Sequence, residues 1–306
     1  MAGGLLGLAV SARFLHHEIE ITTMFPKAKP SDFLGRFREV ISDPLNLLIE
    51  RVPLAGMVEA NDVYLHNGLR VPVAGEGAYY GPFSHLLVIN RGVQEPLEEY
   101  VFQELLKTLP EAPTMLELGA YWGHYSMWLK KLKPRATVIL VEPERDKLAA
   151  GVKNFSKNGF VGEFIQSFVA RGHPEVDSFL RSRSLTHLNI LHADIQGYEV
   201  EMVEGCQSSL SQQMIDYLFI STHSQEIHKG IVTKLNELEY SVEVSSDFDN
   251  DTTSFDGFVF ASSPRVKQLF CNFDVMGRTK IIESRPQELL KGLLDIQRCN
   301  PATRRG

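Results

Sequence analysis

The pattern of hydrophobic and polar positions divides the chain into an irregular first part and a regular second part. From residue 96 onward, short hydrophobic runs alternate with helical patterns, which is typical of a parallel sheet covered on both faces. Because no helical pattern separates the last two strands, we expect them to form an antiparallel pair at one edge of the sheet. The predicted strands lie at 114–118, 137–141, 163–167, 188–193, 217–221, 241–244 and 257–261. The predicted helices lie at 97–109, 125–132, 144–158, 175–181, 198–209 and 226–238.

The first 95 residues form a separate extension in this interpretation. Phe33, Phe37 and Val40 predict a helix that Ser31 or Asp32 caps. Strand patterns on either side of Asn67-Gly68 predict a two-residue hairpin turn, in which both central residues have positive φ. We therefore predict an N-terminal extension at 1–95 with a helix, a hairpin and an aromatic loop, an α/β domain at 96–264, and a C-terminal helical extension with a basic tail at 265–306.

Composition and charge narrow the class of protein. The chain has 306 residues, of which 43% are hydrophobic and 23% are charged, so a packed globular protein is expected. The net charge of −7 argues against nucleic acid as the general partner. The apolar start of the chain is well below the ~18 residues that a membrane span needs. Three scattered cysteines fit a reducing compartment, and we predict a cytoplasmic protein for which a homo-oligomer remains open.

The clearest motif is the turn that follows the first predicted strand of the α/β domain. It reads Glu117-Leu118-Gly119-Ala120-Tyr121-Trp122-Gly123, and its glycines let the backbone pass close to a ligand. The middle glycine of a G-x-G-x-x-G dinucleotide fingerprint is absent, which favours a nucleoside ligand without a pyrophosphate. The second strand ends in Glu142-Pro143, where a carboxylate is placed to accept bonds from both hydroxyl groups of a ribose.

These motifs resemble the class I S-adenosylmethionine-dependent methyltransferases, and within them the FkbM family. The family's first motif, Asp/Glu-x-Gly-x-x-x-Gly, and its acidic residue before proline are both matched. Its later motif, Lys-Ile-Asp-x-Glu-Gly-x-Glu, is matched in part by residues 192–199, which keep Asp194, Gly197 and Glu199. His192 replaces the family's lysine and Gln196 replaces its first glutamate. The resemblance covers residues 96–262.

The resemblance implies a Rossmann-like α/β fold with a seven-stranded, mostly parallel sheet and S-adenosylmethionine as the cofactor. It places the methionine part of the cofactor near the glycine turn, the ribose at Glu142 and the adenine near the end of the third strand. The implied cofactor-binding residues are Glu117, Gly119, Ala120, Tyr121, Gly123, Tyr125, Glu142, Pro143, Gln166, Ser167 and Asp194.

The resemblance implies O-methylation of a hydroxyl group on a small molecule such as a sugar or a natural-product scaffold. A hydroxyl acceptor has to lose its proton. Either His192 or His223 removes it with Asp194 as the orienting group, or Asp194 and His223 share a divalent metal such as Mg²⁺. His124 and His228 are expected on the surface, and Cys206 is expected in the core. Tyr79 and Tyr80 are the candidate substrate residues, in a loop that could cover the site.

Three rival interpretations remain. An NAD-dependent oxidoreductase could use a similar sheet, although it would need the missing pyrophosphate fingerprint. The departures at His192 and Gln196 allow a domain that binds the cofactor without catalysis. Methylation at nitrogen or carbon is the third alternative.

Overall fold

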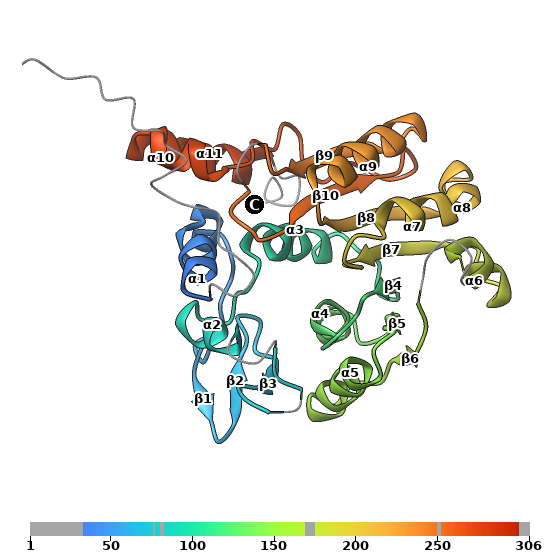
Figure 1. Ribbon diagram of the computed structural model, residues 1–306, viewed down its shortest axis with the longest axis horizontal. Coiled ribbons are helices and arrows are strands. Elements are labelled where there is room, and N and C mark those ends of the chain that lie inside the picture. The colour runs from blue at the N-terminus through green and yellow to red at the C-terminus, as the bar shows by residue number, and fades with distance from the viewer. Residues whose placement is uncertain (1–32, 76, 80–82, 169–174, 250–251, 300–306) are drawn as a thin grey trace, which may run out of the picture.

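A seven-stranded sheet forms the centre of the molecule (Figure 1). The computed structural model describes residues 33–75, 77–79, 83–168, 175–249 and 252–299. The strand order is β6-β5-β4-β7-β8-β10-β9, in which β10 pairs antiparallel with both β8 and β9. This confirms the predicted Rossmann-like α/β fold with an antiparallel edge. The strands are β4 (Thr114–Leu118), β5 (Thr137–Val141), β6 (Glu163–Ile165), β7 (Leu188–Ala193), β8 (Ile215–Thr222), β9 (Ser241–Ser246) and β10 (Gly257–Ser262).

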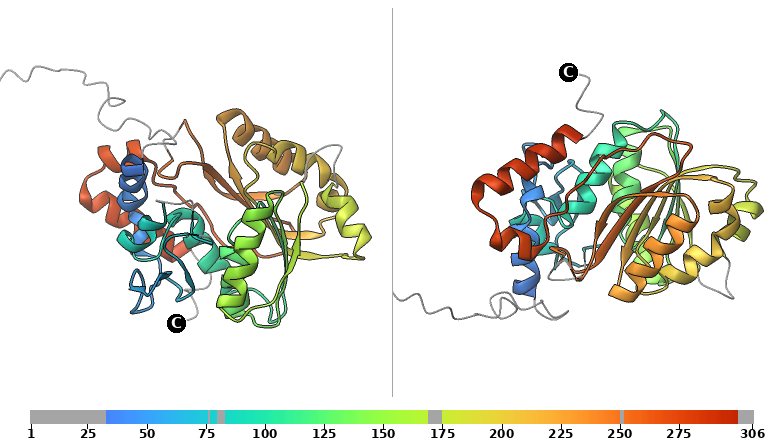
Figure 2. Two further views of the ribbon diagram at one scale, coloured as in Figure 1. Left: turned by 60° about the horizontal axis from the view of Figure 1, so that its bottom comes forward. Right: turned by 90° about the horizontal axis from the view of Figure 1, so that it is seen from above.

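Helices cover both faces of this sheet (Figure 2). One face carries α3 (Pro96–Leu106), α4 (His124–Leu132) and α5 (Arg145–Lys157), and the other carries α6 (Val176–Ser182), α7 (Glu199–Gly205), α8 (Gln207–Ser211) and α9 (Gln225–Glu237). The helix predicted at 198–209 is divided in two at Cys206. The Cys206 side chain is fully buried as predicted, and burial raises its pKa well above the usual value, so this thiol is unreactive.

The N-terminal part contains more regular structure than its sequence suggests. It comprises α1 (Phe33–Ser42), a 3₁₀ turn η2 (Pro44–Leu47), a small sheet of β1 (Val58–Glu59), β2 (Asp62–Tyr64) and β3 (Arg70–Pro72), and α2 (Ser84–Ile89). Ser31 and Asp32, the predicted helix caps, lie outside the described residues.

The prediction of a two-residue hairpin turn between β2 and β3 is wrong. Leu65 still pairs with Leu69, because the Leu65 amide donates to the Leu69 carbonyl at 2.8 Å. The loop therefore has three residues, 66–68. Of these, Gly68 alone has positive φ, at 79°. Asn67 instead uses its side chain, which accepts a bond from the Leu69 amide at 3.1 Å.

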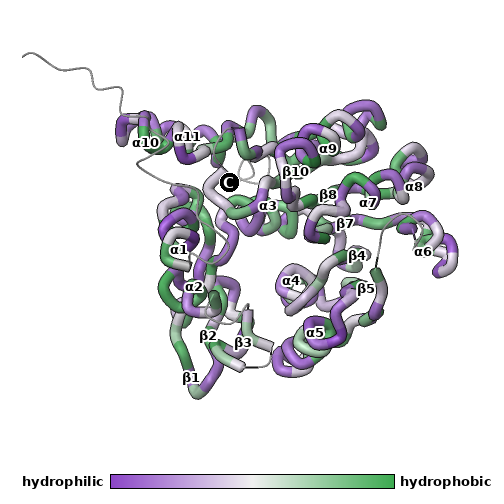
Figure 3. Tube along the Cα trace, viewed as in Figure 1, coloured by the Kyte–Doolittle hydropathy of each residue, from purple (hydrophilic) through white to green (hydrophobic). Residues whose placement is uncertain are grey.

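The C-terminal segment packs against the N-terminal part. Helices α10 (Arg278–Glu283) and α11 (Pro286–Cys299) follow the sheet, and Arg278 of α10 forms a 2.6 Å ion pair with Glu39 of α1. Leu293 and Ile296 of α11 join the hydrophobic cluster on the α3–α4 face. Hydrophobic residues follow the central strands, whereas the outer helices show both hydrophilic and hydrophobic stretches (Figure 3). Within the described ranges, none of the helices combines the length and apolar character that crossing a membrane requires.

Candidate functional site

The glycine turn lies where the carboxyl ends of β4 and β7 come together. Gly119 follows β4 with φ at 71°, and a Cβ at this position would lie 1.8 Å from the Asp194 carbonyl oxygen. Glycine is therefore required here by both conformation and space. Tyr121, two residues later, holds a positive φ of 38°, which costs free energy for a residue with a large side chain. Strained backbone of this kind often accompanies a binding site.

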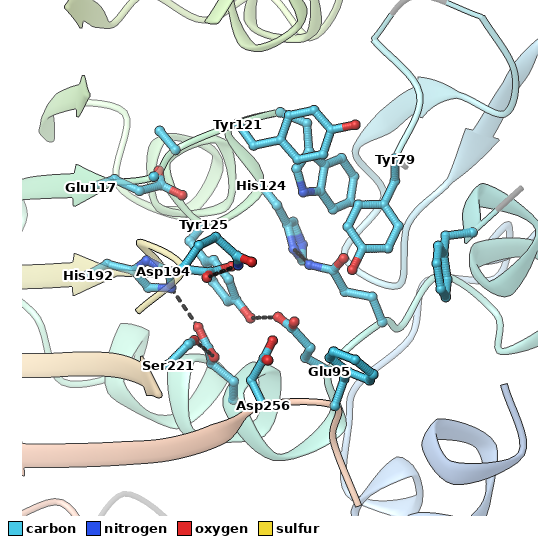
Figure 4. Close-up of a pocket in the computed structure, with 18 of the residues that line it drawn as sticks. Tyr79, Glu95, Glu117, Tyr121, His124, Tyr125, His192, Asp194, Ser221 and Asp256 are labelled. Atoms are coloured by element: carbon cyan, nitrogen blue, oxygen red, sulfur yellow. Dashed lines mark hydrogen bonds and ion pairs between the residues drawn. The ribbon is translucent and has the colours of Figure 1, made fainter. Parts of the chain in front are cut away.

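Two adjoining cavities open at this edge of the sheet. The first has a volume of about 230 Å³ (Figure 4) and the second about 180 Å³. Their walls share Gly119, Tyr121, Asp194 and Gln196, so the two cavities form one elongated site. The first is lined by Arg36, Tyr79, Phe83, Gln94, Glu95, Glu98, Glu117, Ala120, Trp122, His124, Tyr125, His192, Ser221, Phe255 and Asp256 besides the shared residues. The second is lined by Leu118, Val141, Glu142, Pro143, Glu144, Lys147, Ser167, Phe168, Ile195 and Tyr198.

Glu142 is fixed at the end of β5 by two backbone groups. Its Oε2 accepts a bond from the Tyr121 amide at 3.2 Å, and its Oε1 accepts one from the Glu144 amide at 3.0 Å. Burial raises the pKa of Glu142, and these two bonds counteract part of that effect. The carboxylate is thus held rigidly in the wall of the second cavity, with further lone pairs that a ligand hydroxyl group could use.

Most of the predicted cofactor residues line the two cavities. Gly123 and Gln166 do not. Gly123 has a packing role instead: it precedes α4 with φ at 76°, and a Cβ there would lie 2.9 Å from the Phe155 ring. Gln166 is exposed, and its side-chain amide donates to the Pro143 carbonyl at 3.2 Å. The sequence motif therefore includes both residues that line the cavities and residues that support their walls.

Carboxyl groups crowd the first cavity. Glu98 accepts a 2.6 Å bond from His192 and a 3.1 Å bond from Ser221, and Tyr125 donates to Glu95 at 3.1 Å (Figure 4). Burial raises the pKa of Glu95 well above its usual value, and the negative charge of Glu98 adds to this. His192 has the opposite balance, because burial lowers its pKa but the bond and charge of Glu98 outweigh that and raise it.

His223 is held by three carboxyl groups. Its Nδ1 lies 2.8 Å from Glu199, and its Nε2 lies 3.3 Å from Asp194 and 3.6 Å from Asp256. Burial lowers the pKa of His223, but the bonds to Asp194 and Glu199 and the charge of Asp256 outweigh it and raise the pKa to about 10. The sequence predicts a near-neutral pKa for His223, and the neighbouring carboxyl groups raise it instead, which favours the charged imidazolium at neutral pH.

Asp256 has a pKa close to neutrality in the same network. Burial and the negative charge of Asp194 raise its pKa to about 7, although the positive charges of His223 and Arg36 act in the opposite direction. The residue directly precedes β10 and lines the first cavity. Asp194, in contrast, has a lowered pKa: burial would raise it, but the bond from His223 outweighs that effect.

The metal interpretation of Asp194 and His223 is not supported. In the described part of the chain, these two residues do not belong to any group of three side chains with the spacing of a metal site. His223 instead uses both ring nitrogens for contacts with carboxyl groups. The position of His223 explains why it does not join a metal site, because two neighbouring carboxyl groups already balance the positive charge of its imidazolium.

Two histidines that were expected on the surface are buried. His124 is 1% exposed and begins α4, where its ring stacks on Trp128 at 5.8 Å. His228 is 2% exposed and its two ring nitrogens contact Thr222 at 2.9 Å and Ser245 at 2.8 Å. Sequence periodicity missed both, because their burial depends on contacts between elements that are distant in the sequence.

The aromatic loop of the N-terminal part reaches the first cavity. Tyr79 lines it and packs its ring 5.0 Å from Trp122 (Figure 4), while the Tyr121 hydroxyl donates to the Ala78 carbonyl at 3.0 Å. Tyr80, the second predicted substrate residue, lies outside the described residues. These two contacts therefore hold the aromatic loop against the glycine turn.

Sequence reasoning missed several residues of the first cavity: Arg36, Glu95, Glu98 and Asp256. One signal could have identified Asp256. The start of an antiparallel strand lies at the same edge as the carboxyl ends of its parallel neighbours, so a residue just before β10 belongs to the site edge. No comparable signal marks Arg36, since α1 reaches the cavity only through the packing of the whole N-terminal part.

Comparisons with known proteins give structural likeness at low sequence identity. No protein-family model matches the chain, and no curated protein matches its sequence. Among solved structures, the chain is similar to a SAM-dependent methyltransferase from Agrobacterium tumefaciens, with a TM-score of 0.45, 14% identity, and coverage of 70% of this chain and 73% of that chain. It is similar to a precorrin-6y C5,15-methyltransferase from Geobacter metallireducens, with a TM-score of 0.41, 12% identity, and coverage of 63% and 99%. It is also similar to TrmK of M. capricolum, solved with S-adenosylhomocysteine, with a TM-score of 0.41, 10% identity, and coverage of 65% and 83%.

Proposed function

We propose that the chain is an S-adenosylmethionine-dependent methyltransferase, related to the FkbM family, that methylates a hydroxyl group of a small molecule. The observation that carries this proposal is the pair of adjoining cavities at the carboxyl ends of β4, β5 and β7. The second cavity suits a nucleoside, because Glu142 faces it beside the apolar Phe168 and Ile195. The first suits the sulfonium end of the cofactor together with an acceptor.

The charge of the first cavity supports a cationic ligand. Its wall contains the carboxyl groups of Glu95, Glu98, Glu117, Asp194 and Asp256. Asp256 and Glu95 have raised pKa values and Asp194 is paired with His223, so a sulfonium would supply positive charge that this wall accepts, whereas the pyrophosphate of NAD would add further negative charge. The acidic wall therefore favours S-adenosylmethionine over the dinucleotide of the rival oxidoreductase interpretation.

We propose Asp256 as the group that accepts the proton of the acceptor hydroxyl. Its carboxyl group lines the first cavity and contacts the His223 imidazolium at 3.6 Å. A base works best when its pKa lies near the working pH, and the pKa of about 7 meets that condition. In this scheme His223 holds Asp194 and Asp256 in place, and the Glu98–His192 pair forms the adjacent wall.

The methyl group comes from the cofactor, so the protein mainly has to align the acceptor. Transfer forms an oxygen–carbon bond as the carbon–sulfur bond breaks, and the hydroxyl proton passes to Asp256. Tyr79 and Arg36 form the acceptor side of the wall, which comes from the N-terminal part. A volume of about 230 Å³ supports a small acceptor or one end of a larger one. Neutral S-adenosylhomocysteine then remains, which the acidic wall holds less strongly.

Calorimetry with the purified chain tests the cofactor assignment. Glu142→Ala should weaken S-adenosylmethionine binding by about 1–3 kcal/mol, because the ribose hydroxyls and two backbone amides lose their acceptor. This corresponds to a rise in Kd of about 5- to 150-fold. Glu163→Ala, an exposed substitution on neighbouring β6, is the matched control and should leave Kd unchanged. Unchanged affinity in Glu142→Ala would contradict the ribose assignment, and tight NADH binding would favour the oxidoreductase.

Turnover distinguishes the remaining alternatives. Labelled S-adenosylmethionine is offered with a panel of hydroxylated and amine-bearing small molecules, with and without added Mg²⁺. An O-methylated product that forms without Mg²⁺ supports the proposal. Products methylated only at nitrogen or carbon would overturn the assignment of a hydroxyl acceptor. A rate that depends on Mg²⁺ would overturn the assignment of Asp256 as the base. Cofactor binding without turnover of any acceptor would support the non-catalytic alternative.

A further inference from the structure

A second cluster of titratable side chains lies behind the first cavity. His66 comes from the loop between β2 and β3, Glu99 from α3, and His124 from the first position of α4. Their exposed fractions are 1%, 0% and 1%. One ligand atom of each residue lies within 4.8 Å of one ligand atom of each of the others, and within the described ranges this is the group with the spacing of a metal site.

The donor atoms of this cluster are already oriented by neighbouring backbone groups. His66 Nδ1 lies 3.2 Å from the Glu50 carbonyl oxygen, so Nδ1–H donates there and Nε2 keeps its lone pair. Glu99 Oε1 accepts bonds from the Gln94 amide at 2.9 Å and the Glu95 amide at 3.3 Å. Its other oxygen, Oε2, is thereby directed at His66. This is the outer-shell arrangement that holds metal ligands in place.

Two of these buried atoms are without hydrogen bonds. His66 Nε2 and Glu99 Oε2 lie 3.1 Å apart, yet they are not aligned for a hydrogen bond, and neither has another partner among the described residues. Leaving two such atoms buried costs free energy. A simple ion pair between His66 and Glu99 would instead favour a straight N–H···O contact.

We propose that His66, Glu99 and His124 bind one divalent transition-metal ion, with Zn²⁺ as the best fit. Two imidazole nitrogens and one carboxylate oxygen are typical zinc donors. In a tetrahedral site with bonds of about 2.0–2.1 Å, donor atoms lie roughly 3.3 Å apart. The 3.1 Å contact between His66 and Glu99 matches this spacing, and a ligand atom of His124 lies within 4.8 Å of both, so metal binding would draw His124 closer.

Gln94 would offer a fourth donor once its side-chain amide turns over. Its Nε2 lies 3.4 Å from His124 Nδ1, and its Oε1 is buried without a hydrogen-bond partner within the described ranges. Gln94 and His124 both line the first cavity, which gives an ion a route from solvent to the cluster. The cluster therefore has the ligands, the oriented outer shell and the entry path that a metal site requires.

The proposed ion is structural, and its ligands are not among the residues proposed to bind the ribose or to accept the proton. Its ligands belong to the N-terminal part and to two helices on one face of the main sheet. Binding would cross-link these elements beside the wall that carries Tyr79, and it should raise the stability of the whole chain. This inference does not depend on the proposed methyltransferase activity, since metal content and stability can be measured without substrate.

Metal analysis of the full chain, expressed without a histidine tag, tests the proposal. After chelator treatment and dialysis the protein is exposed to Zn²⁺ or Co²⁺, and the bound metal is measured by mass spectrometry. We expect about one Zn²⁺ per chain, visible absorption bands of tetrahedral Co²⁺ that Zn²⁺ displaces, and a higher unfolding midpoint with metal. Less than about 0.1 equivalent bound, or no tetrahedral Co²⁺ bands, would overturn the site.

A matched pair of variants locates the ion. Glu99→Gln keeps an acceptor for the Gln94 and Glu95 amides and offers an N–H to His66, so it should fold. Metal affinity should nevertheless fall by about 100-fold or more through loss of the anionic ligand. His223→Gln, in the other histidine–carboxylate network, should retain full uptake. Loss of the metal in His223→Gln, or full uptake in Glu99→Gln, would contradict the assignment. If Glu99→Gln does not fold, the stoichiometry and Co²⁺ spectrum of the parent chain still decide the question.

Discussion

Replacing Asp256 with asparagine tests whether this carboxyl group removes the proton of the acceptor. The substitution keeps the shape of the side chain and removes its ability to accept a proton. General-base catalysis contributes roughly 10²–10⁴-fold to a rate, so turnover at pH 8 should fall by about that factor. Cofactor affinity should change much less, because Asp256 lies in the first cavity while the proposed ribose contacts lie in the second.

The pH dependence distinguishes Asp256 from His223 as the base. With a pKa of about 7, Asp256 is ionised in about one molecule in ten at pH 6 and in nine of ten at pH 8, so kcat/KM should rise roughly tenfold and then level off. With a pKa of about 10, neutral His223 would be present in about one molecule in a thousand at pH 7. If His223 were the base, the rate would therefore keep rising up to about pH 10.

The cofactor shifts the first profile in a known direction. A bound sulfonium would add positive charge near Asp256 and lower the pKa of its carboxyl group, so the inflection in kcat should lie below pH 7 while that in kcat/KM for the cofactor stays near 7. Initial rates from pH 5 to 10 in the parent chain, in Asp256→Asn and in Asp249→Asn as an exposed control give the required profiles. A rate that climbs steadily to pH 10 in the parent chain, or an unchanged inflection in Asp256→Asn, would refute the assignment.

Three other predictions concern the same site. Gly119→Ala places a Cβ 1.8 Å from the Asp194 carbonyl in a left-handed conformation, so chemical denaturation should show a loss of about 3 kcal/mol or more. The stabilising contribution of the His223 imidazolium is fully present below pH 6.5 and is lost as the pH rises through about 10, so urea unfolding should show the parent chain losing its advantage over His223→Gln progressively from about pH 6.5 to 10. Binding of S-adenosylmethionine near pH 7 should release protons from Asp256, which calorimetry in buffers of different ionisation enthalpy detects; no buffer dependence would contradict this.

The central strands could be predicted from the sequence because their environment is uniform. Strands β4, β5 and β7 begin and end at the predicted residues, since each is a hydrophobic run buried from both faces. The meeting of Gly119 with Asp194 follows from the same topology, because the carboxyl ends of neighbouring parallel strands share one edge. Hydrophobic pattern therefore located the strand ends that line the second cavity, which we propose as the cofactor side.

The acceptor side could not be located in this way. Glu95 and Arg36 reach the first cavity from the N-terminal part, whose packing on the sheet leaves no periodic signal in the sequence. The pKa of His223 depends on Glu199 and Asp256, which are brought to it by a helix and by the antiparallel strand. From the sequence alone a histidine is expected to have a pKa near neutrality. Only the number of carboxylates around His223 in the fold shows that its pKa is raised.

The crowding of acids in the first cavity has a direct bearing on its function. Carboxyl groups buried this close together cannot all be ionised without compensation. Glu98 is compensated by His192 and Asp194 by His223, whereas Asp256 and Glu95 hold protons more readily than usual. A sulfonium brings into this wall the positive charge that the protons otherwise supply. Cofactor binding would thus free Asp256 from its proton at the moment when a base is needed, so one electrostatic arrangement would serve both binding and proton removal.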